Sequence, residues 1–339
     1  MEGDQTATPD DLYEKARRLE RGDDGPPDDS AALVAMAEAA HAGHAGAQFV
    51  MAERCLAGRG VDRDYGEALR WAILAAAQGH AGAQSLVGYC HGQGLGVPQN
   101  DVEACYWYRL AAERHPLAAH NLAKRCFTGN GTPENEAEGL RWLRHAADLG
   151  HPDAAFELAH RMLEGRGVEP DPESALSLFQ LACAYGLPDG ALWSGLCHVN
   201  GWGTAVSPAE GAIWIARAAD QGHAEAARYL AGMYLDGEGI DQDDEQAFAW
   251  LNRAVALGDP VAHVTLGGLY ANGRGCERNL VLAYVHTSLG LEAWPEEADR
   301  NLGAIALMLT DDDLDAARAM ILQARMAKLQ LEPPEKDSD

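Results

Sequence analysis

The stretch EALRWAILAAAQGHAGAQSLVGYCHGQGLGV, residues 67–97, contains two helical patterns on either side of Gly79. Apolar and small residues recur in both patterns at a spacing of three to four, which predicts two short amphipathic helices. One such stripe consists of Ala68, Trp71, Ala75 and Ala76. Gly79 and the Gly-x-Gly pair at 94–96 predict the ends of these helices, because glycine readily adopts the left-handed conformation of a helix C-cap.

The same pattern recurs along the chain at intervals of 35 or 36 residues. The position of Trp71 is occupied in successive units by Trp71, Trp107, Trp142, Leu178, Trp214, Trp250 and His286, and Ala35 fits one period upstream. Gly-x-Gly pairs recur in phase, at Gly58/Gly60, Gly94/Gly96, Gly129/Gly131, Gly165/Gly167, Gly201/Gly203, Gly237/Gly239 and Gly273/Gly275. Two markers in register predict a repeat protein, in which one hairpin has too little core and the stacking of neighbours buries the apolar stripes.

The position three residues before the tryptophan is small in every unit. It holds Ala68, Ala104, Gly139, Ala175, Gly211, Ala247 and Ala283. A residue of this size lets two helices approach closely. We therefore expect the tryptophan to fill the gap between neighbouring hairpins.

The pattern A-x-x-W-x-x-x-A-A-x-x-G-H-x-x-A-Q-x-x-x-G, followed by G-x-G-V, is nearly complete in residues 68–97 and resembles the Sel1-like repeat, a relative of the tetratricopeptide repeat. The resemblance covers about residues 31–310, and Ala35, Leu178 and His286 depart from it where they replace the tryptophan. Since no strand alternation is present, the predicted fold is all-α, a right-handed α-solenoid superhelix of about seven to eight 36-residue helical hairpins. The resemblance also implies a non-enzymatic function, because Sel1-like proteins are mostly adaptors in signalling, assembly or quality control.

We expect four segments along the chain. Residues 1–30 form an acidic N-terminal segment, in which a helix at 12–21 covers the first hairpin, and residues 31–310 form the solenoid. Residues 311–331 are predicted as a C-terminal capping helix, and residues 332–339 as a disordered, solvated tail.

The charge balance bears on the class of partner. The sequence has 26 Lys and Arg against 52 Asp and Glu, a formal net charge of −26, so it repels phosphate backbones and anionic lipids. We therefore predict no nucleic-acid partner and no membrane partner. The absence of a long apolar run predicts no transmembrane helix, and the N-terminus lacks the apolar core of a secretory signal. Seven cysteines without a CxxC pair favour a reducing, cytoplasmic location, and the composition rich in Ala, Gly, Arg and Asp favours a bacterial source.

A partner-binding groove follows from the resemblance, because in the tetratricopeptide fold the first helix of each hairpin lines the inner groove. The matching phases hold Phe49, Glu53, Tyr89, His120, Lys124, Phe127, Phe156, His160, Leu196 and Arg228, with Ser85, Leu192 and Leu235 beside them. An exposed apolar groove usually marks a partner site, and Lys124 and Arg228 have the charge to hold a carboxylate of a peptide. The predicted function is therefore a scaffold or adaptor that binds a partner protein or peptide, without a cofactor. The alternative is that these side chains contact only neighbouring helices or solvent.

A second hypothesis is metal or redox handling. One phase of the repeat and its neighbours hold Cys55, Cys90, His91, Cys126, Met162, Cys197 and His198, side chains that suit Cu(I) or Zn(II). Equivalent residues of adjacent hairpins lie about 10 Å apart, whereas zinc ligands lie about 2.0–2.3 Å from the ion. The favoured interpretation is therefore half-buried packing, with no metal site.

A third hypothesis is an enzyme whose site contains the non-repeating groove residues His120, Lys124 and His160. The sequence indicates no reaction for them, and the Gly-x-Gly loops lack the GK[ST] ending of a phosphate loop. Features that recur once per repeat favour extended recognition over catalysis. The prediction is therefore that the protein is not an enzyme.

Two smaller features complete the sequence pattern. Histidine follows glycine at His44, His80, His151 and His223, just after a predicted helix end, where a protonated imidazole interacts favourably with the helix dipole. Trp202 lies between Gly201 and Gly203. We expect it to plug the space between hairpins by stacking on Trp193, and the alternative is an exposed contact.

Overall fold

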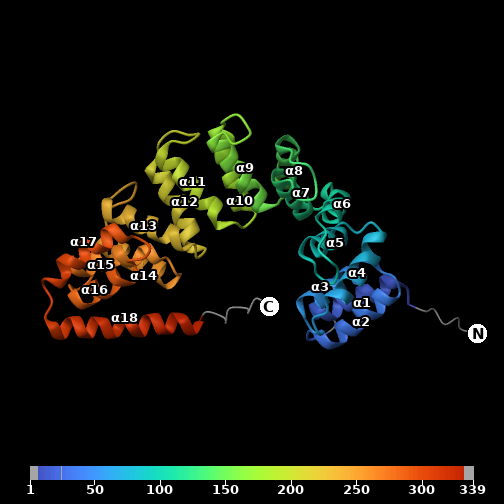
Figure 1. The fold of residues 1–339 in the computed structure, drawn as a ribbon, viewed down its shortest axis with the longest axis horizontal. Helices are drawn as coiled ribbons and strands as arrows, with labels where there is room; N and C mark the ends of the chain where they lie inside the picture. Colours follow the sequence, from blue (N-terminus) through green and yellow to red (C-terminus); the bar gives the residue numbers. More distant parts are fainter. Residues whose placement is uncertain (1–6, 24, 332–339) are drawn as a thin grey trace, which may run out of the picture. The chain divides into compact units, whose positions relative to one another are not determined.

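The computed structural model describes residues 7–23 and 25–331, and within these ranges every regular element is an α-helix (Figure 1). The eighteen helices are α1 (Pro9–Arg21), α2 (Asp29–His41), α3 (Ala45–Ala57), α4 (Tyr65–Ala77), α5 (Ala81–Gln93), α6 (Asp101–Ala112), α7 (Pro116–Thr128), α8 (Glu136–Asp148), α9 (Pro152–Glu164), α10 (Pro172–Ala184), α11 (Pro188–Asn200), α12 (Pro208–Asp220), α13 (Ala224–Asp236), α14 (Asp244–Ala256), α15 (Pro260–Asn272), α16 (Leu280–Leu289), α17 (Pro295–Ala306) and α18 (Asp311–Leu331). The predicted all-α solenoid of helical hairpins is confirmed.

The contacts between helices divide the chain into two compact units, residues 1–170 and 171–339. In unit 1, the hairpins α1/α2, α3/α4, α5/α6 and α7/α8 follow one another, and α9 packs against α8. In unit 2, α11 packs against α10 and α12, and α13/α14 and α15/α16 form the next hairpins. The sequence suggested one solenoid over residues 31–310, without this division. The right-handed superhelical path of the whole chain stays a prediction.

Glycine shapes the loop between the two helices of a hairpin. The first glycine of each Gly-x-Gly pair, such as Gly58 and Gly94, is the left-handed C-cap of the preceding helix, as predicted. In five of the seven pairs the second glycine lies against the backbone of the hairpin before it. A Cβ atom on Gly131 would lie 2.0 Å from the carbonyl oxygen of Asp101, so any larger residue would push the two hairpins apart.

Small residues keep the helices close, as the sequence predicts. Ala68 and its equivalents are buried, and a Cβ atom on Gly139 would lie 2.5 Å from the ring of Phe127. The tryptophan three residues later varies more than predicted. Trp71 and Trp142 are buried, at 9% and 8% exposed, whereas Trp107, Trp214 and Trp250 are only half-buried. Only Trp71 and Trp142 therefore fill the gap between hairpins as completely as predicted.

The histidines after the glycines do not serve the helix that ends before them. His44, His80, His151 and His223 are the N-caps of the helices that follow, and His115 does the same for α7. In each case a backbone N–H three residues later donates to Nδ1, over 3.0–3.4 Å. A protonated imidazole has no lone pair to accept this bond, so the expected contact between an imidazolium and the preceding helix dipole is wrong.

Burial strengthens the preference of these caps for the neutral form. It lowers the pKa of His80, His115 and His151, and a neighbouring histidine lowers each further, because a charged imidazole loses hydration there and meets like charge. A neutral acceptor also suits the positive end of a helix better than a cation does.

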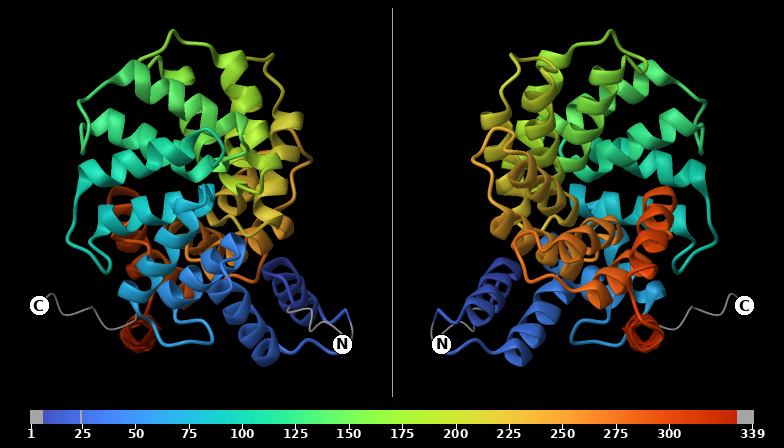
Figure 2. Two further views of the ribbon diagram at one scale, coloured as in Figure 1. Left: turned by 90° about the vertical axis from the view of Figure 1, so that its right-hand side faces the viewer. Right: turned by 90° about the vertical axis from the view of Figure 1, so that its left-hand side faces the viewer.

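Helices at both ends extend the repeats. In unit 1, α1 begins at Pro9 and packs against α2 (Figure 2), and the ring of Tyr13 stacks on the imidazole of His44 at 4.1 Å. In unit 2, α18 covers residues 311–331 and packs against α16. The predicted tail at 332–339 lies outside the described residues. No helix in residues 7–23 and 25–331 combines the length and apolar character needed to cross a bilayer.

Candidate partner-binding site

Several predicted groove residues join consecutive hairpins. They share the fifth position of the first helix and contact the N-cap residue of the next hairpin. The ring of Phe49 lies 4.7 Å from that of His80, and the ring of His120 lies 4.5 Å from that of His151. His120 is only 5% exposed. At this position the side chains are therefore largely used for packing between repeats.

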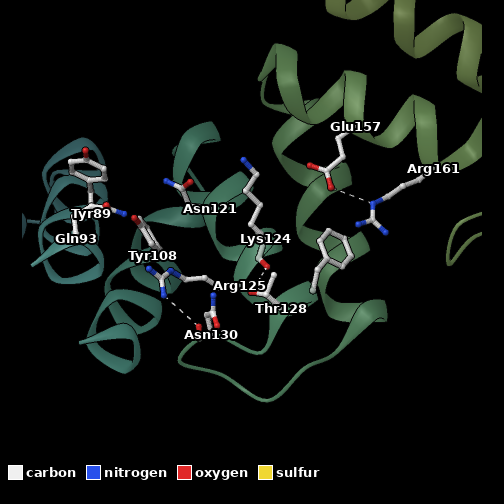
Figure 3. A pocket seen from close by; sticks show the side chains of 11 residues that line it. Tyr89, Gln93, Tyr108, Asn121, Lys124, Arg125, Thr128, Asn130, Glu157 and Arg161 are labelled. Atoms are coloured by element: carbon white, nitrogen blue, oxygen red, sulfur yellow. Dashed lines mark hydrogen bonds and ion pairs between the residues drawn. The ribbon is translucent and has the colours of Figure 1, made fainter. Parts of the chain in front are cut away.

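Three other predicted residues line a cavity of about 480 Å³ in unit 1. Its walls come mainly from α5, α7 and α9, the first helices of successive hairpins (Figure 3). The lining residues are Tyr89, Gln93, Tyr108, Asn121, Lys124, Arg125, Phe127, Thr128, Asn130, Glu157 and Arg161. The structure thus brings the predicted Tyr89, Lys124 and Phe127 together.

Both arginines of this cavity already have partners. Arg125 forms an ion pair with Asp101 at 2.7 Å, and its guanidinium lies 5.6 Å from the ring centre of Tyr108. Arg161 contacts Glu157 at 3.3 Å and lies 3.8 Å from the ring centre of Phe127. The two guanidinium groups therefore cover aromatic faces while carboxylates balance their charge.

The remaining charged groups differ in how firmly they are held. Glu157 accepts a hydrogen bond from Nε2 of His120 at 3.4 Å in the tautomer that protonates this nitrogen, and this contact lowers the pKa of Glu157, with Arg161 acting in the same direction. Lys124 is exposed and, within the part of the chain that the structure describes, forms no ion pair within 4 Å. Figure 3 shows Asn121 and Lys124 on α7 between the residues of α5 and those of α9. Lys124 is therefore the cavity cation that is available to a ligand.

The other predicted groove residues do not join this cavity. Leu196 and Arg228 line a separate cavity of about 600 Å³ in unit 2, together with Leu192. Glu53 is exposed on α3, Phe156 is half-buried with its ring 4.6 Å from that of His160, and Ser85 is buried. Leu235 is half-buried and packs against the core of unit 2.

Sequence reasoning missed the position that follows the joining residue. This sixth position of the first helix holds Asn121, Glu157, Trp193, Tyr229 and Thr265, and all five line one of the two cavities. A shift of one residue turns a side chain by about 100° around a helix, which separates the joint from the cavity wall in unit 1. In unit 2, the fifth-position residues Leu192 and Arg228 line the cavity as well. The large and polar residue types at the sixth position were the available signal.

The Cys, His and Met residues of the metal hypothesis are not arranged as a site. In residues 7–23 and 25–331, no three His, Cys, Asp or Glu side chains are grouped so that they could hold a metal ion. Cys90, Cys126 and Cys197 are buried, and burial raises the pKa of each thiol to about 11. A thiol held protonated is a poor metal ligand, because the thiolate is the coordinating form. The favoured packing interpretation agrees with this burial.

The residues of the enzyme hypothesis have separate partners. His120 contacts Glu157, and Nδ1 of His160 lies 4.0 Å from a carboxylate oxygen of Glu164. The structure therefore gives the two histidines different carboxylates and gives Lys124 none.

Comparison with known proteins identifies the repeat. The Sel1 repeat family model matches seven consecutive segments, residues 45–80, 81–115, 116–151, 152–186, 188–223, 224–259 and 260–288. A Sel1 repeat protein from Oxalobacter formigenes aligns with a TM-score of 0.64 and 27% identity, over 88% of this chain and 86% of that chain. The c5321 protective antigen of uropathogenic Escherichia coli, which displays an SLR fold, aligns with a TM-score of 0.58 and 23% identity, over 98% and 89% of the two chains. No curated protein sequence matches the chain.

Proposed function

We propose that this protein, which belongs to the Sel1 repeat family, is a non-enzymatic scaffold that binds a partner protein or peptide. Sel1 repeat proteins are typically protein-interaction scaffolds. The repeated architecture supports this function, because each hairpin offers an equivalent strip of surface and an extended partner can contact several strips at once.

The available charge of Lys124 carries the finer proposal. The cavity of unit 1 binds an acidic group of the partner, either a glutamate or aspartate side chain or a C-terminal carboxylate. Arg125 and Arg161 are already balanced by Asp101 and Glu157, so an incoming carboxylate gains most from the ammonium group of Lys124. The main cost of binding is the water that the ammonium group of Lys124 loses. This cost is moderate because the side chain is exposed.

Neighbouring groups favour the same occupant. Asn121 and Gln93 supply amide donors at the cavity wall, and Tyr89 supplies a hydroxyl and an exposed ring. The ring helps to bury the apolar part of a partner side chain, which supplies most of the affinity in a typical interface.

Two neutral-capped tripeptides test the proposal, acetyl-Leu-Glu-Leu-amide and its glutamine analogue. We expect the glutamate peptide to bind the full chain about tenfold more tightly, a difference of about 1.4 kcal/mol. Chemical shifts of the α7 amides measure both affinities in one titration. Lys124→Met removes the preference for glutamate, while Lys15→Met, which neutralises an exposed lysine on α1, leaves it intact.

Equal affinity for the two peptides in the native protein would overturn the acidic-group assignment. So would a preference that survives in Lys124→Met. Both variants replace exposed side chains, so a matching melting temperature in all three proteins shows that the fold is unchanged.

A further inference from the structure

The cavity of unit 2 has a different chemistry from the cavity of unit 1. It lies mainly between α11, α13 and α15 and has a volume of about 600 Å³. Four aromatic side chains line it, those of Trp193, Trp202, Tyr229 and Trp294. Three tryptophans in one cavity are a concentrated aromatic surface in a chain that has eight in all.

The indole rings are held in place but remain accessible. Trp193 stacks between Phe179, at 5.6 Å between ring centres, and Trp202, at 6.4 Å. The predicted stacking of Trp202 on Trp193 is therefore confirmed, yet Trp202 is still 38% exposed. Trp294 is 43% exposed. Exposed indole faces carry negative quadrupole potential, which attracts a cation.

The one basic residue of the cavity lining is already neutralised. Nε of Arg228 lies 2.8 Å from a carboxylate oxygen of Asp259, and Nη2 lies 3.0 Å from one of Glu225. Its guanidinium also lies 5.0 Å from the ring centre of Tyr229, so it covers that aromatic face. Asp259 in turn is buried and accepts the backbone N–H groups that begin α15. Arg228 is therefore a fixed part of the wall.

Two acidic residues at the rim are free of close ion pairs. Asp236 ends α13 and Glu238 follows it in the Gly-x-Gly loop, and both are exposed. Neither forms an ion pair within 4 Å among the residues that the structure describes. Arg274 feels the charge of Asp236, but two contacts bind its guanidinium to Asp244. The lining thus holds three acidic residues, Glu225, Asp236 and Glu238. Its one basic residue is the paired Arg228.

We propose that the cavity of unit 2 binds a cationic side chain, that of an arginine or lysine on a partner protein. The faces of Trp202 and Trp294 receive the charged group and its aliphatic stem, and Asp236 and Glu238 supply the countercharge. An acidic or neutral apolar side chain leaves the two carboxylates unpaired and gains less. This site is independent of the acidic-group site at Lys124 and has the opposite charge preference.

Matched tripeptides test the assignment, acetyl-Leu-Arg-Leu-amide and its citrulline analogue, which keeps the shape but not the charge. The indole N–H signals of Trp202 and Trp294, identified with Trp202→Phe and Trp294→Phe, follow each titration in the full chain. We expect these signals to shift with the arginine peptide and its affinity to exceed that of the citrulline peptide about tenfold. Asp236→Asn with Glu238→Gln removes this preference.

A control double variant keeps the same change in net charge outside the cavity. Glu210→Gln with Glu245→Gln neutralises two exposed acids in the first turns of α12 and α14 and leaves the arginine preference intact. Lys124→Met also leaves it intact, which separates this proposal from the one for unit 1. Equal affinity for arginine and citrulline, or equal losses in the two double variants, would overturn the assignment.

Discussion

The cavities of the two units occupy equivalent faces of the repeat, because the first helices of three successive hairpins line each of them. Their chemistry nevertheless differs at matching positions. The middle helices of the two cavities are α7 and α13, in which Lys124 corresponds to Gly232 and Asn121 corresponds to Tyr229. The unit 1 cavity thus keeps an available ammonium group, whereas the unit 2 cavity keeps available carboxylates and indole faces. The two proposals above therefore assign opposite charge preferences to one repeated scaffold, through the side chains that line each cavity.

The largest expected effect tests whether each unit depends on its own core. Trp142→Ala removes a buried ring from unit 1 and leaves a cavity, which we expect to cost about 3–5 kcal/mol of unfolding free energy. Urea titration, followed through amide signals of each unit, measures the loss separately.

Trp250→Ala serves as the partner experiment in unit 2, where the half-buried ring predicts a smaller loss. If Trp142→Ala destabilises the helices of both units equally, the two units unfold together and the comparison between them fails. An unchanged stability would contradict the cavity argument itself.

A feature that the two units share has an intermediate effect. Gly131→Ala in unit 1 and Gly203→Ala in unit 2 place a Cβ atom 2.0 and 2.1 Å from backbone carbonyl oxygens, at a φ of +74° in both cases. We expect each change to cost about 2–4 kcal/mol, from left-handed strain and from separation of the hairpins. Differential scanning calorimetry compares the two proteins directly.

Gly79→Ala isolates the conformational part of that cost. Its φ is +81°, but no atom lies within 4 Å of the new Cβ, so about 1–2 kcal/mol is expected. If Gly131→Ala were no worse than Gly79→Ala, close backbone contact would not be what requires the second glycine of the loop.

The smallest expected effect is the loss of stability for each histidine cap at low pH. Unit 1 has four histidine N-caps, His44, His80, His115 and His151, and unit 2 has His223 alone among the described residues. Because the folded state lowers the pKa of His80, His115 and His151, their contribution is complete above the ordinary histidine pKa of about 6.5. It is lost as the pH falls through the lower folded values.

We therefore expect unit 1 to lose roughly 1 kcal/mol of stability for each cap that is broken between pH 7.5 and pH 5. In unit 2, burial lowers the pKa of His286 to about 4, so that unit loses stability in acid for a separate reason. Melting curves across this range measure the loss. His80→Asn keeps an N-cap that does not titrate, so it reduces the acid sensitivity of unit 1. Acid sensitivity of unit 1 that is unaltered in this variant would rule out the caps as its cause.

The fold was open to prediction because each repeat obeys local rules. Helix spacing, the two loop glycines and the small position at Ala68 act within one hairpin or between direct neighbours, so their period in the sequence is the period of the structure. The structural function of the histidines was harder to predict. His80 follows one helix and precedes the next, and only the bond from Ala83 N–H to its Nδ1 decides which helix it serves.

The candidate sites depend on contacts that the sequence pattern does not contain. Arg125 appears as available as Lys124 until its ion pair with Asp101, 24 residues away, is known. Likewise, the predicted groove position at His120 is used for the joint, and the cavity wall begins one residue later at Asn121. The repeat period in the sequence was therefore sufficient to predict the helical hairpins. Which helix positions face the cavity could be determined only from the contacts between packed hairpins.

The joint between hairpins has a consequence for engineering these arrays. Arg228 is matched to Asp259, and Phe49 to His80, across two different repeats. A hairpin transplanted alone would lose one partner of each such contact. Chimaeras of this protein should therefore be joined so that both residues of a contact come from the same parent. The adjacent position in the cavity wall can then be randomised when new specificities are selected.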